Sequence, residues 1–216
     1  MCDRELRKLG RLQDTQMQVS IDTVLCWMEA IRNSKDTHRT LEAFWRGQMR
    51  SKIWLCEILY QHGPAFPRTV DIFGGWIGTL ASLLVETSGI LPGHIRSIDI
   101  DPECEDIART INMEMLKVDR FEAITADMCD FKSDAELVIN TSCEHITQEQ
   151  YDRWLANMSN DSFIVLQSNN YVIDEHVRIA NSLEHFKEQS NIETVFEGTL
   201  ELPLYDRYML MGRKRV

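Results

Sequence analysis

The sequence predicts an α/β protein whose sheet is doubly wound and mostly parallel, with helices preceding the sheet. Short apolar segments of strand length recur along residues 64–216, helical segments separate most of them, and a glycine-rich turn directly follows the first. Strands that alternate with helices favour a parallel sheet covered on both faces. The last two strands have no helix between them, so we expect an antiparallel pair at the C-terminal end.

The length and composition indicate an ordinary globular protein. The chain has 216 residues, with 44% hydrophobic and 26% charged, which suits one domain with a helical extension. It contains no run of about 18 apolar residues that would span a membrane. The charged N-terminus lacks the apolar segment of a signal peptide. We therefore expect a cytoplasmic protein.

The charge and the cysteines argue against two classes of partner. A formal net charge of −11 repels phosphate backbones, so we expect no nucleic-acid partner. The basic clusters at 46–52 and 213–215 are interpreted as solvated surface, with a local basic patch as the alternative. None of the six cysteines forms a C-x-x-C pair. We therefore expect buried, reduced thiols and no metal site. The oligomeric state stays open.

Residues 1–63 are expected to form a helical extension or lid, and residues 64–216 the cofactor-binding domain. Apolar residues at helical spacing occupy 21–31, and a second apolar face runs from 41 to 59 before the stop signal Gly63-Pro64. Basic and aromatic side chains of this region would line a ligand site if its helices cover the sheet edge. Otherwise the tryptophans pack in the core and the basic residues face water, which is the interpretation we adopt. The residues concerned are Trp45, Arg46, Arg50, Lys52 and Trp54.

The sheet domain resolves into elements in chain order. We expect strands at 69–73, 94–99, 121–125, 135–140, 162–167, 194–201 and 207–212. Helices are expected at 80–85, 101–111, 148–158 and 174–189. Asp101 can cap the second of these helices, and Pro102 suits its first position.

A glycine turn and two acids point to a ligand site. Gly74 and Gly75 follow the first strand, where glycine lets the backbone approach a ligand and the next helix offers free amide groups. Asp99 ends the second strand, where an acid accepts hydrogen bonds from a ribose; the alternative is that it merely ends the strand. Asp127 follows the third strand and would meet an adenine amino group, with Met128 packed on the ring. The alternative there is a turn with a core methionine.

As a set, these features resemble the class I S-adenosylmethionine-dependent methyltransferases over about residues 65–216. The series is Val70-Asp71, Gly74-Gly75 with Gly78, 97–103, 126–128, and Leu137-Val138-Ile139-Asn140 followed by 143–146. The resemblance implies a Rossmann-like fold, S-adenosylmethionine as cofactor, and methyl transfer to a small-molecule or protein acceptor.

The resemblance also implies roles by position. Asp71 would contact the amino group of the methionine moiety, directly or through water, and Asp99, followed by Ile100, would hold both ribose hydroxyls. Three glycines would shape the cofactor loop, namely Gly74, Gly75 and Gly78. The adenine would lie between Asp127 and Met128. The residues near the sulfonium would be Asn140, Thr141 and Ser142.

The turn departs from the family pattern, which leaves alternatives open. Phe73 stands where the first glycine is expected, and Trp76-Ile77 lengthens the loop. A different use of the cofactor is therefore an alternative, either transfer of its aminocarboxypropyl group or its cleavage. A module that binds cofactor without turnover is another. No Asn-Pro-Pro-Tyr or Asp-Pro-Pro-Tyr follows the fourth strand, which disfavours the branch that methylates nucleic-acid amino groups.

Few residues are candidates for acid–base chemistry. His145 follows Glu144 just beyond the fourth strand, at the edge where ligands bind, and histidine titrates near neutral pH. The pair is the predicted catalytic site, with a purely structural role as the alternative. Cys143 is a weaker candidate for a nucleophile, since most unpaired cysteines are buried and inert. Asn169-Asn170-Tyr171 would either bind substrate or form a turn.

Overall fold

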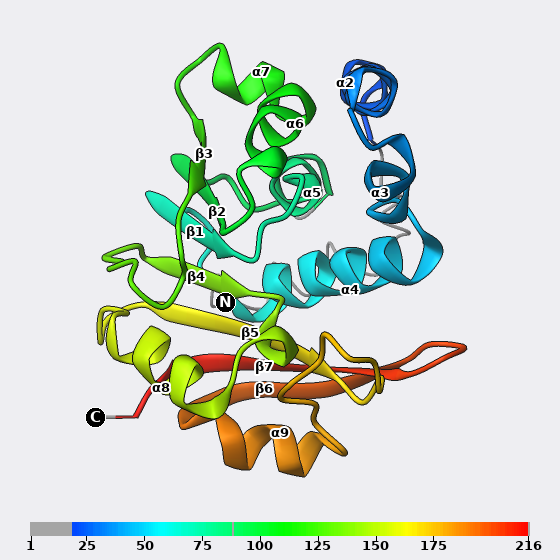
Figure 1. Ribbon diagram of the computed structural model, residues 1–216. Helices are drawn as coiled ribbons and strands as arrows, with labels where there is room; N and C mark the ends of the chain where they lie inside the picture. The colour runs from blue at the N-terminus through cyan, green and yellow to red at the C-terminus, as the bar shows by residue number, and fades with distance from the viewer. Residues whose placement is uncertain (1–18, 88, 216) are drawn as a thin grey trace.

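The chain folds around one seven-stranded sheet (Figure 1). A computed structural model describes residues 19–87 and 89–215. The strand order is β3-β2-β1-β4-β5-β7-β6. The bounds are β1 Thr69–Phe73, β2 His94–Asp99, β3 Phe121–Thr125, β4 Leu137–Asn140, β5 Phe163–Asn169, β6 Ile192–Glu201 and β7 Asp206–Lys214. The first five strands pair in parallel, whereas β7 pairs antiparallel with both β5 and β6. This confirms the predicted fold class.

Helices cover both faces of the sheet (Figure 1). They are α2 Ile21–Asn33, α3 Thr37–Glu42, α4 Arg46–His62, α5 Thr79–Thr87, α6 Glu103–Ile111, α7 Met113–Leu116, the 3₁₀ turn η1 Cys143–His145, α8 Gln148–Ala156 and α9 Leu183–Ser190. Leu59 of α4 and Leu83 of α5 share one hydrophobic core with Ile72 of β1. Trp154 of α8 and Phe186 of α9 share a second core on the opposite face. None of the described helices is long and apolar enough to cross a membrane.

The order of the strands places a crevice beside β1. The chain moves outward from β1 to β2 and β3, then returns to the other side of β1 with β4 and β5. The loops that leave the carboxyl ends of β1 and β4 therefore run to opposite sides. In open α/β sheets, ligands bind in the crevice that such a reversal opens.

The N-terminal helices differ in part from expectation. The apolar face expected at 41–59 is divided between α3 and α4, and Trp45 lies at the break between them. Trp54 packs partly buried against the core, as expected. Two expectations were wrong. Lys52 is only 8% exposed, because it lies on the face of α4 that packs against the sheet, and Trp45 is 47% exposed rather than buried in the core.

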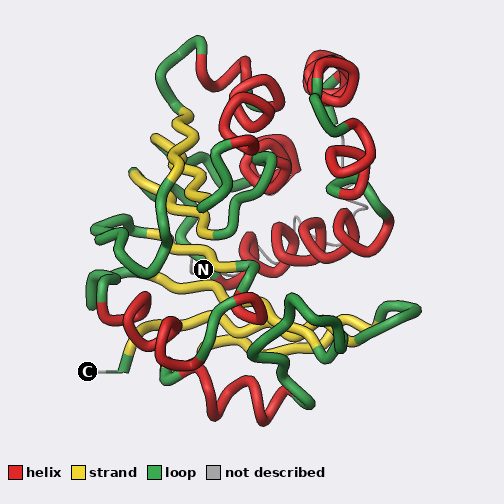
Figure 2. The backbone as a smooth tube through the Cα atoms, in the orientation of Figure 1, coloured by secondary structure: helices red, strands yellow, loops and turns green. Residues whose placement is uncertain are grey.

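The helix expected at 174–189 forms only in its second half, as α9; the preceding residues are loop (Figure 2). The backbone amides of Val177 and Arg178 both donate to the carbonyl of Glu144, and the amide of Ala180 donates to the carbonyl of Asn169. Because these amides bond to distant segments, they are not available for helical hydrogen bonds. The helical pattern was therefore overridden by tertiary contacts.

Candidate functional site

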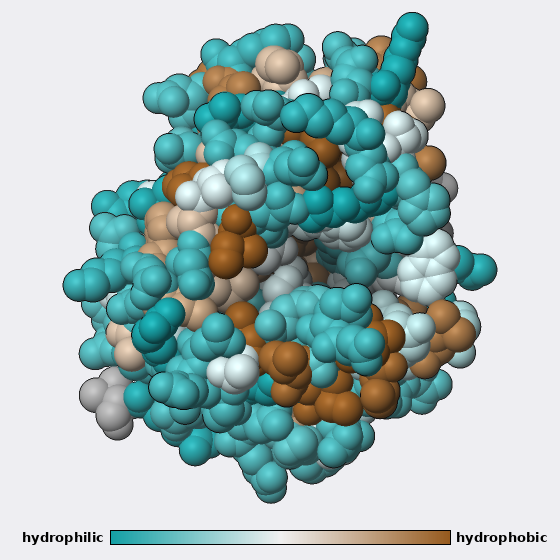
Figure 3. All heavy atoms as spheres, viewed as in Figure 1, coloured by the Kyte–Doolittle hydropathy of each residue, from teal (hydrophilic) through white to brown (hydrophobic). Residues whose placement is uncertain are grey.

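A cavity opens next to the glycine turn, between α3, α4 and the carboxyl edge of the sheet. It has a volume of about 610 Å³ and is lined mostly by apolar and aromatic side chains, among them Leu41, Phe44, Trp45 and Trp76. The space-filling view shows this face of the molecule hollowed over α4 (Figure 3). Ligand pockets for small molecules have volumes of about 300–1,000 Å³ and predominantly apolar walls, so the cavity suits a ligand of nucleoside size.

The turn after β1 uses glycine where the backbone is left-handed. Gly74 has φ +62° and Gly78 has φ +77°, values that favour glycine. A Cβ on Gly74 would lie 2.1 Å from Oγ of Ser142, so the turn and the segment after β4 touch directly. A Cβ on Gly78 would lie 2.5 Å from Nδ2 of Asn112, which fixes that glycine against α6. Trp76, between them, also has positive φ, at +47°.

Gly75 packs against a neighbouring strand and does not face open space for a ligand. A Cβ there would lie 2.0 Å from Oγ of Ser97 on the neighbouring strand β2. A side chain at this position would therefore collide with β2. The backbone amide of Gly75 donates to the carbonyl of Ile98, which joins the turn to β2.

Asp99 lies at the end of β2 directly beside the turn. Its Oδ2 accepts a hydrogen bond from the amide of Trp76 at 2.7 Å, and its Oδ1 accepts one from the amide of Asp101 at 3.0 Å. A carboxylate oxygen can accept two hydrogen bonds, so each oxygen keeps capacity for a hydroxyl donor. This fits the role expected for Asp99 on a ribose. Asp101 accepts from the amide of Glu103 at the start of α6, but the helix begins at Glu103 with Pro102 in the N-cap position, one residue later than expected.

The segments after β3 and β4 meet near Gly74. Met128 and Asn140 contact each other, with Nδ2 of Asn140 3.6 Å from the sulfur. Oδ1 of Asn140 accepts from the amide of Ser142 and thereby shapes the loop over Gly74. Asp127 uses Oδ1 to accept from the amide of Cys129, which is a local turn. The structure thus brings four of the predicted positions together: Gly74, Met128, Asn140 and Ser142.

Asp71 has protein partners for both of its carboxylate oxygens. Arg96 binds it in a bidentate pair at 2.6 and 2.7 Å, and the hydroxyl of Ser133 donates to it at 2.5 Å. The side chain is completely buried, two residues before the strand ends. Because the side chain is buried within β1 and its oxygens face Arg96 and Ser133, we assign this residue a role in the sheet. Ile100, beyond β2, is 68% exposed.

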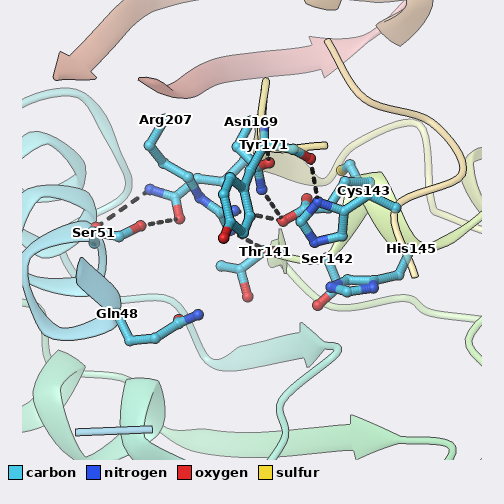
Figure 4. A network of polar contacts seen from close by, with 12 residues as sticks. Gln48, Ser51, Thr141, Ser142, Cys143, His145, Asn169, Tyr171 and Arg207 are labelled. Carbon is cyan, nitrogen blue, oxygen red and sulfur yellow. Dashed lines mark hydrogen bonds and ion pairs between the residues drawn. The ribbon is translucent and has the colours of Figure 1, made fainter. Parts of the chain in front are cut away.

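A buried polar network links the segment after β4 to β5 and β7 at the same edge (Figure 4). Oε1 of Glu144 accepts from Nδ2 of Asn169 and from the guanidinium of Arg207, each at 2.5 Å. Arg207 also donates to the carbonyl of Thr141. Glu144 is 2% exposed and Arg207 is 7% exposed, so the ion pair is shielded from water. The network fixes the loop that carries Thr141 and Ser142.

The first turns of α4 complete this edge. Ser51 donates to Oε1 of Gln167 at 3.1 Å, deep in the core. Burial and the nearby charge of Arg207 lower the pKa of Lys52 from 10.5 to about 7. Its ammonium group donates to Oε1 of Gln48, a residue that lines the cavity. The helical extension therefore contributes to the candidate site.

The predicted catalytic residues differ in their surroundings. His145 is exposed, and its Nδ1 lies 3.2 Å from the carbonyl of Glu175. Cys143 is completely buried, and burial raises the pKa of its thiol to about 12. The thiolate is the nucleophilic form of cysteine, so this position is unsuited to nucleophilic attack.

Sequence reasoning missed several residues of this edge, namely Gln48, Gln167, His176, Arg178 and Arg207. His176 lies close to His145, with ring centroids 4.7 Å apart. It falls in the segment that was expected to be helical. No local spacing in the sequence links it to Glu144, so only the folded chain reveals the contact.

Comparisons with known proteins identify the fold. No protein-family model matches the sequence, and no curated protein matches it. Several solved structures match it. One is magnesium protoporphyrin IX methyltransferase (ChlM) from Synechocystis PCC 6803 with bound SAH, with a TM-score of 0.64 and 11% sequence identity. That match covers 90% of this chain and 95% of that chain. MtNAS in complex with MTA and tNA matches with a TM-score of 0.59 and 15% identity over 89% of this chain and 70% of that chain.

The pyocyanin biosynthetic protein PhzM matches with a TM-score of 0.58 and 14% identity over 87% of this chain. The match covers 61% of PhzM, so the present chain spans less than two thirds of that protein. Identities this low concern the fold alone. The chain has the fold of the class I S-adenosylmethionine-dependent methyltransferases, as its sequence predicted.

Proposed function

We propose that the protein binds S-adenosylmethionine at the carboxyl edge of β1, β2 and β4 and transfers its methyl group to a small-molecule or protein acceptor. The observation that carries the proposal is the position of Asp99. It lies beside the left-handed glycine turn, holds the amide of Trp76, and keeps one acceptor site on each oxygen. A ribose presents two neighbouring hydroxyl donors, which match these two sites.

The other residues at this edge fit the rest of the cofactor. Met128 and Ser142 come together over Gly74, where they would contact the ligand next to the turn. The cavity on the Trp76 side has aromatic walls that suit an acceptor ring. S-adenosylmethionine supplies an activated methyl group, so the protein needs only to align the acceptor with it, exclude water and, where required, accept a proton.

A second candidate function has its own support. Phe73 replaces the first glycine of the family pattern and is completely buried between Phe131 and Trp154, so the turn is built differently. MtNAS, which shares the fold, is described in complex with MTA. Methylthioadenosine is what remains of S-adenosylmethionine when its aminocarboxypropyl group leaves. Transfer of that group is therefore the alternative activity.

Product analysis separates the two candidates. The protein is incubated with S-adenosylmethionine and cell extract, and the nucleoside products are identified by mass spectrometry. Methyl transfer yields S-adenosylhomocysteine, and aminocarboxypropyl transfer yields methylthioadenosine. A chain that binds the cofactor but forms neither product would contradict both enzyme proposals and favour a binding module.

A further inference from the structure

Glu144 carries a buried oxygen that lacks a partner. Oε1 is held by Asn169 and Arg207, whereas Oε2 has no hydrogen-bond partner among the described residues. The side chain is 2% exposed, so water does not readily compensate for this lack. Leaving a buried polar group unsatisfied costs about 1–3 kcal/mol, and more when the group is charged. A ligand that accepts electron pairs would satisfy this oxygen.

Two histidines lie beside Glu144, and each has one ring nitrogen whose lone pair is available to bind such a ligand. Nδ1 of His145 lies 3.2 Å from the carbonyl of Glu175, and Nδ1 of His176 lies 2.8 Å from the carbonyl of Tyr171. A carbonyl can only accept a hydrogen bond, so Nδ1 carries the proton in both neutral rings. The lone pair is then on Nε2. Histidines that bind metals usually donate their other ring N–H to a carbonyl or carboxylate in this way.

The three side chains are close enough to share one ion. One ring nitrogen of each histidine and one carboxylate oxygen of Glu144 all lie within 4.8 Å of one another. Ligand atoms bound at about 2.1 Å to one ion sit about 3 to 3.5 Å apart at neighbouring positions. Small rotations of the two histidine rings, both of which have solvent on one side, would close the difference.

We propose that Glu144, His145 and His176 bind a divalent first-row transition-metal ion, such as Zn²⁺ or Mn²⁺. Imidazole nitrogen and carboxylate oxygen are the donors that these ions prefer. The sequence predicted no metal site, because His176 lies 31 residues beyond His145, far outside any ligand motif of short spacing.

The backbone that carries His176 is firmly positioned. Val177 and Arg178 donate their amides to the carbonyl of Glu144, which ties the loop directly to the ligand-bearing turn η1. The guanidinium of Arg178 donates to the side chain of Gln148 at 2.7 Å and to the carbonyl of Gln189 at 2.8 Å. It also stacks 4.0 Å from the ring of Tyr151. The site is thus preorganised by contacts that do not involve the ion.

The exposure of the histidines indicates what the ion would do. Structural zinc sites are closed by four protein ligands, whereas catalytic sites keep positions open. Three protein ligands leave positions free here, and His145 is on the exposed side. The site lies on the same loop as Thr141 and Ser142, at the edge where we place the cofactor. Resting on the proposed function, we infer that an oxygen of the acceptor fills the open position.

A hydroxyl acceptor bound at the open position would then be methylated on oxygen with release of one proton. Coordination lowers the pKa of a bound hydroxyl, so its proton passes to solvent water. The oxygen forms a bond to the methyl carbon, the carbon–sulfur bond breaks, and its electron pair stays on sulfur. The products are the methyl ether, S-adenosylhomocysteine and one proton.

The test is metal binding by the full chain, stripped of metal and carrying no purification tag. Co²⁺ serves as the spectroscopic probe and Zn²⁺ as the competitor, both titrated without S-adenosylmethionine. We expect one Co²⁺ per chain with the visible absorption of a nitrogen- and oxygen-ligated ion. His176→Ala and His145→Ala should each weaken binding at least tenfold. His38→Ala is the matched control, since His38 on α3 has a side chain that is 87% exposed, and it should bind like the wild type.

Three outcomes would overturn the proposal: wild-type affinity in His176→Ala, weakened binding in the control, or an intense thiolate-to-cobalt band that assigns the ion to a cysteine. Glu144→Gln should also lose the ion. This variant removes a buried charge, so its melting curve is recorded first. If it does not fold, the two histidine variants alone test the proposal. Cofactor affinity is measured separately. Metal binding without cofactor binding would refute the proposed function and leave the site standing.

Discussion

Replacement of Lys52 by methionine should change how the stability of the protein depends on pH. Lys52 is buried, and none of the acidic side chains in the described part of the chain pairs with its ammonium, which donates to Gln48. Burial and the charge of Arg207 lower its pKa from 10.5 to about 7. The folded protein therefore releases this proton near pH 7, whereas the unfolded chain retains it until about pH 10.5.

The sign and size of the effect follow from this difference. Between about pH 7 and pH 10.5 the unfolded state binds more protons, so Lys52 makes the free energy of unfolding rise with pH. The limiting slope is about 1.4 kcal/mol per pH unit. From about pH 7 to about pH 8.5 the wild type should gain about 1.5 kcal/mol relative to Lys52→Met. Below about pH 6 the difference between the two proteins should be constant.

Urea unfolding followed by tryptophan fluorescence, repeated across this pH range, measures the difference. Other titrating groups are common to both proteins and cancel when their free energies of unfolding are subtracted. Lys132→Met is the matched control, since this lysine is exposed, and its difference from the wild type should stay flat. Parallel curves for the wild type and Lys52→Met between pH 7 and pH 8.5 would refute the claim that burial lowers the pKa of Lys52.

Three further substitutions probe the site. Asp99→Ala should weaken S-adenosylmethionine binding by about 2–4 kcal/mol, the scale of two hydrogen bonds to a charged group, as measured by calorimetry. Gly75→Val should destabilise the fold by about 1–3 kcal/mol, because its side chain would collide with Ser97, while the folded fraction keeps cofactor affinity; melting and calorimetry measure both. Arg207→Met should cost about 3–5 kcal/mol in urea unfolding, because it leaves the charge of Glu144 buried and unpaired.

Each of these predictions has an outcome that contradicts it. Asp134→Ala is the control for Asp99, since its side chain is 93% exposed and it should leave affinity unchanged. Equal affinity in both aspartate variants would remove Asp99 from the site. A Gly75→Val protein that melts normally but no longer binds cofactor would place that side chain in the ligand after all. Wild-type stability in Arg207→Met would show that the ion pair contributes little.

Much of the fold was predictable because strands and turns are local in sequence. Val70 and Ile72 are apolar and lie a few residues before two glycines, and they form the buried strand expected. Asp101 was expected to serve the start of α6, and it does accept from the amide of Glu103, since such bonds join residues only two or three positions apart. These features follow from propensity and pattern without any knowledge of distant contacts.

The errors came from contacts between distant segments. The direction in which Lys52 points depends on how α4 lies against the sheet, and no helical pattern of charged residues encodes that. The loop at 174–182 lost its expected helix to the carbonyls of Glu144 and Asn169. The same contacts bring His176 beside His145, which explains why the candidate metal site was not foreseen. The packing of Gly75 was not foreseen because its close neighbour, Ser97, lies on another strand.

Hydrogen–deuterium exchange with and without S-adenosylhomocysteine tests the location of the cofactor site most directly. The ligand would cover the loops at the carboxyl edge of the sheet. We predict slower exchange in peptides that contain 73–79, 99–101, 126–129 and 140–142, with little change in α8 and α9 on the opposite face. Protection confined to α8 and α9, or no protection anywhere at saturating ligand, would contradict the central claim that this edge binds the cofactor.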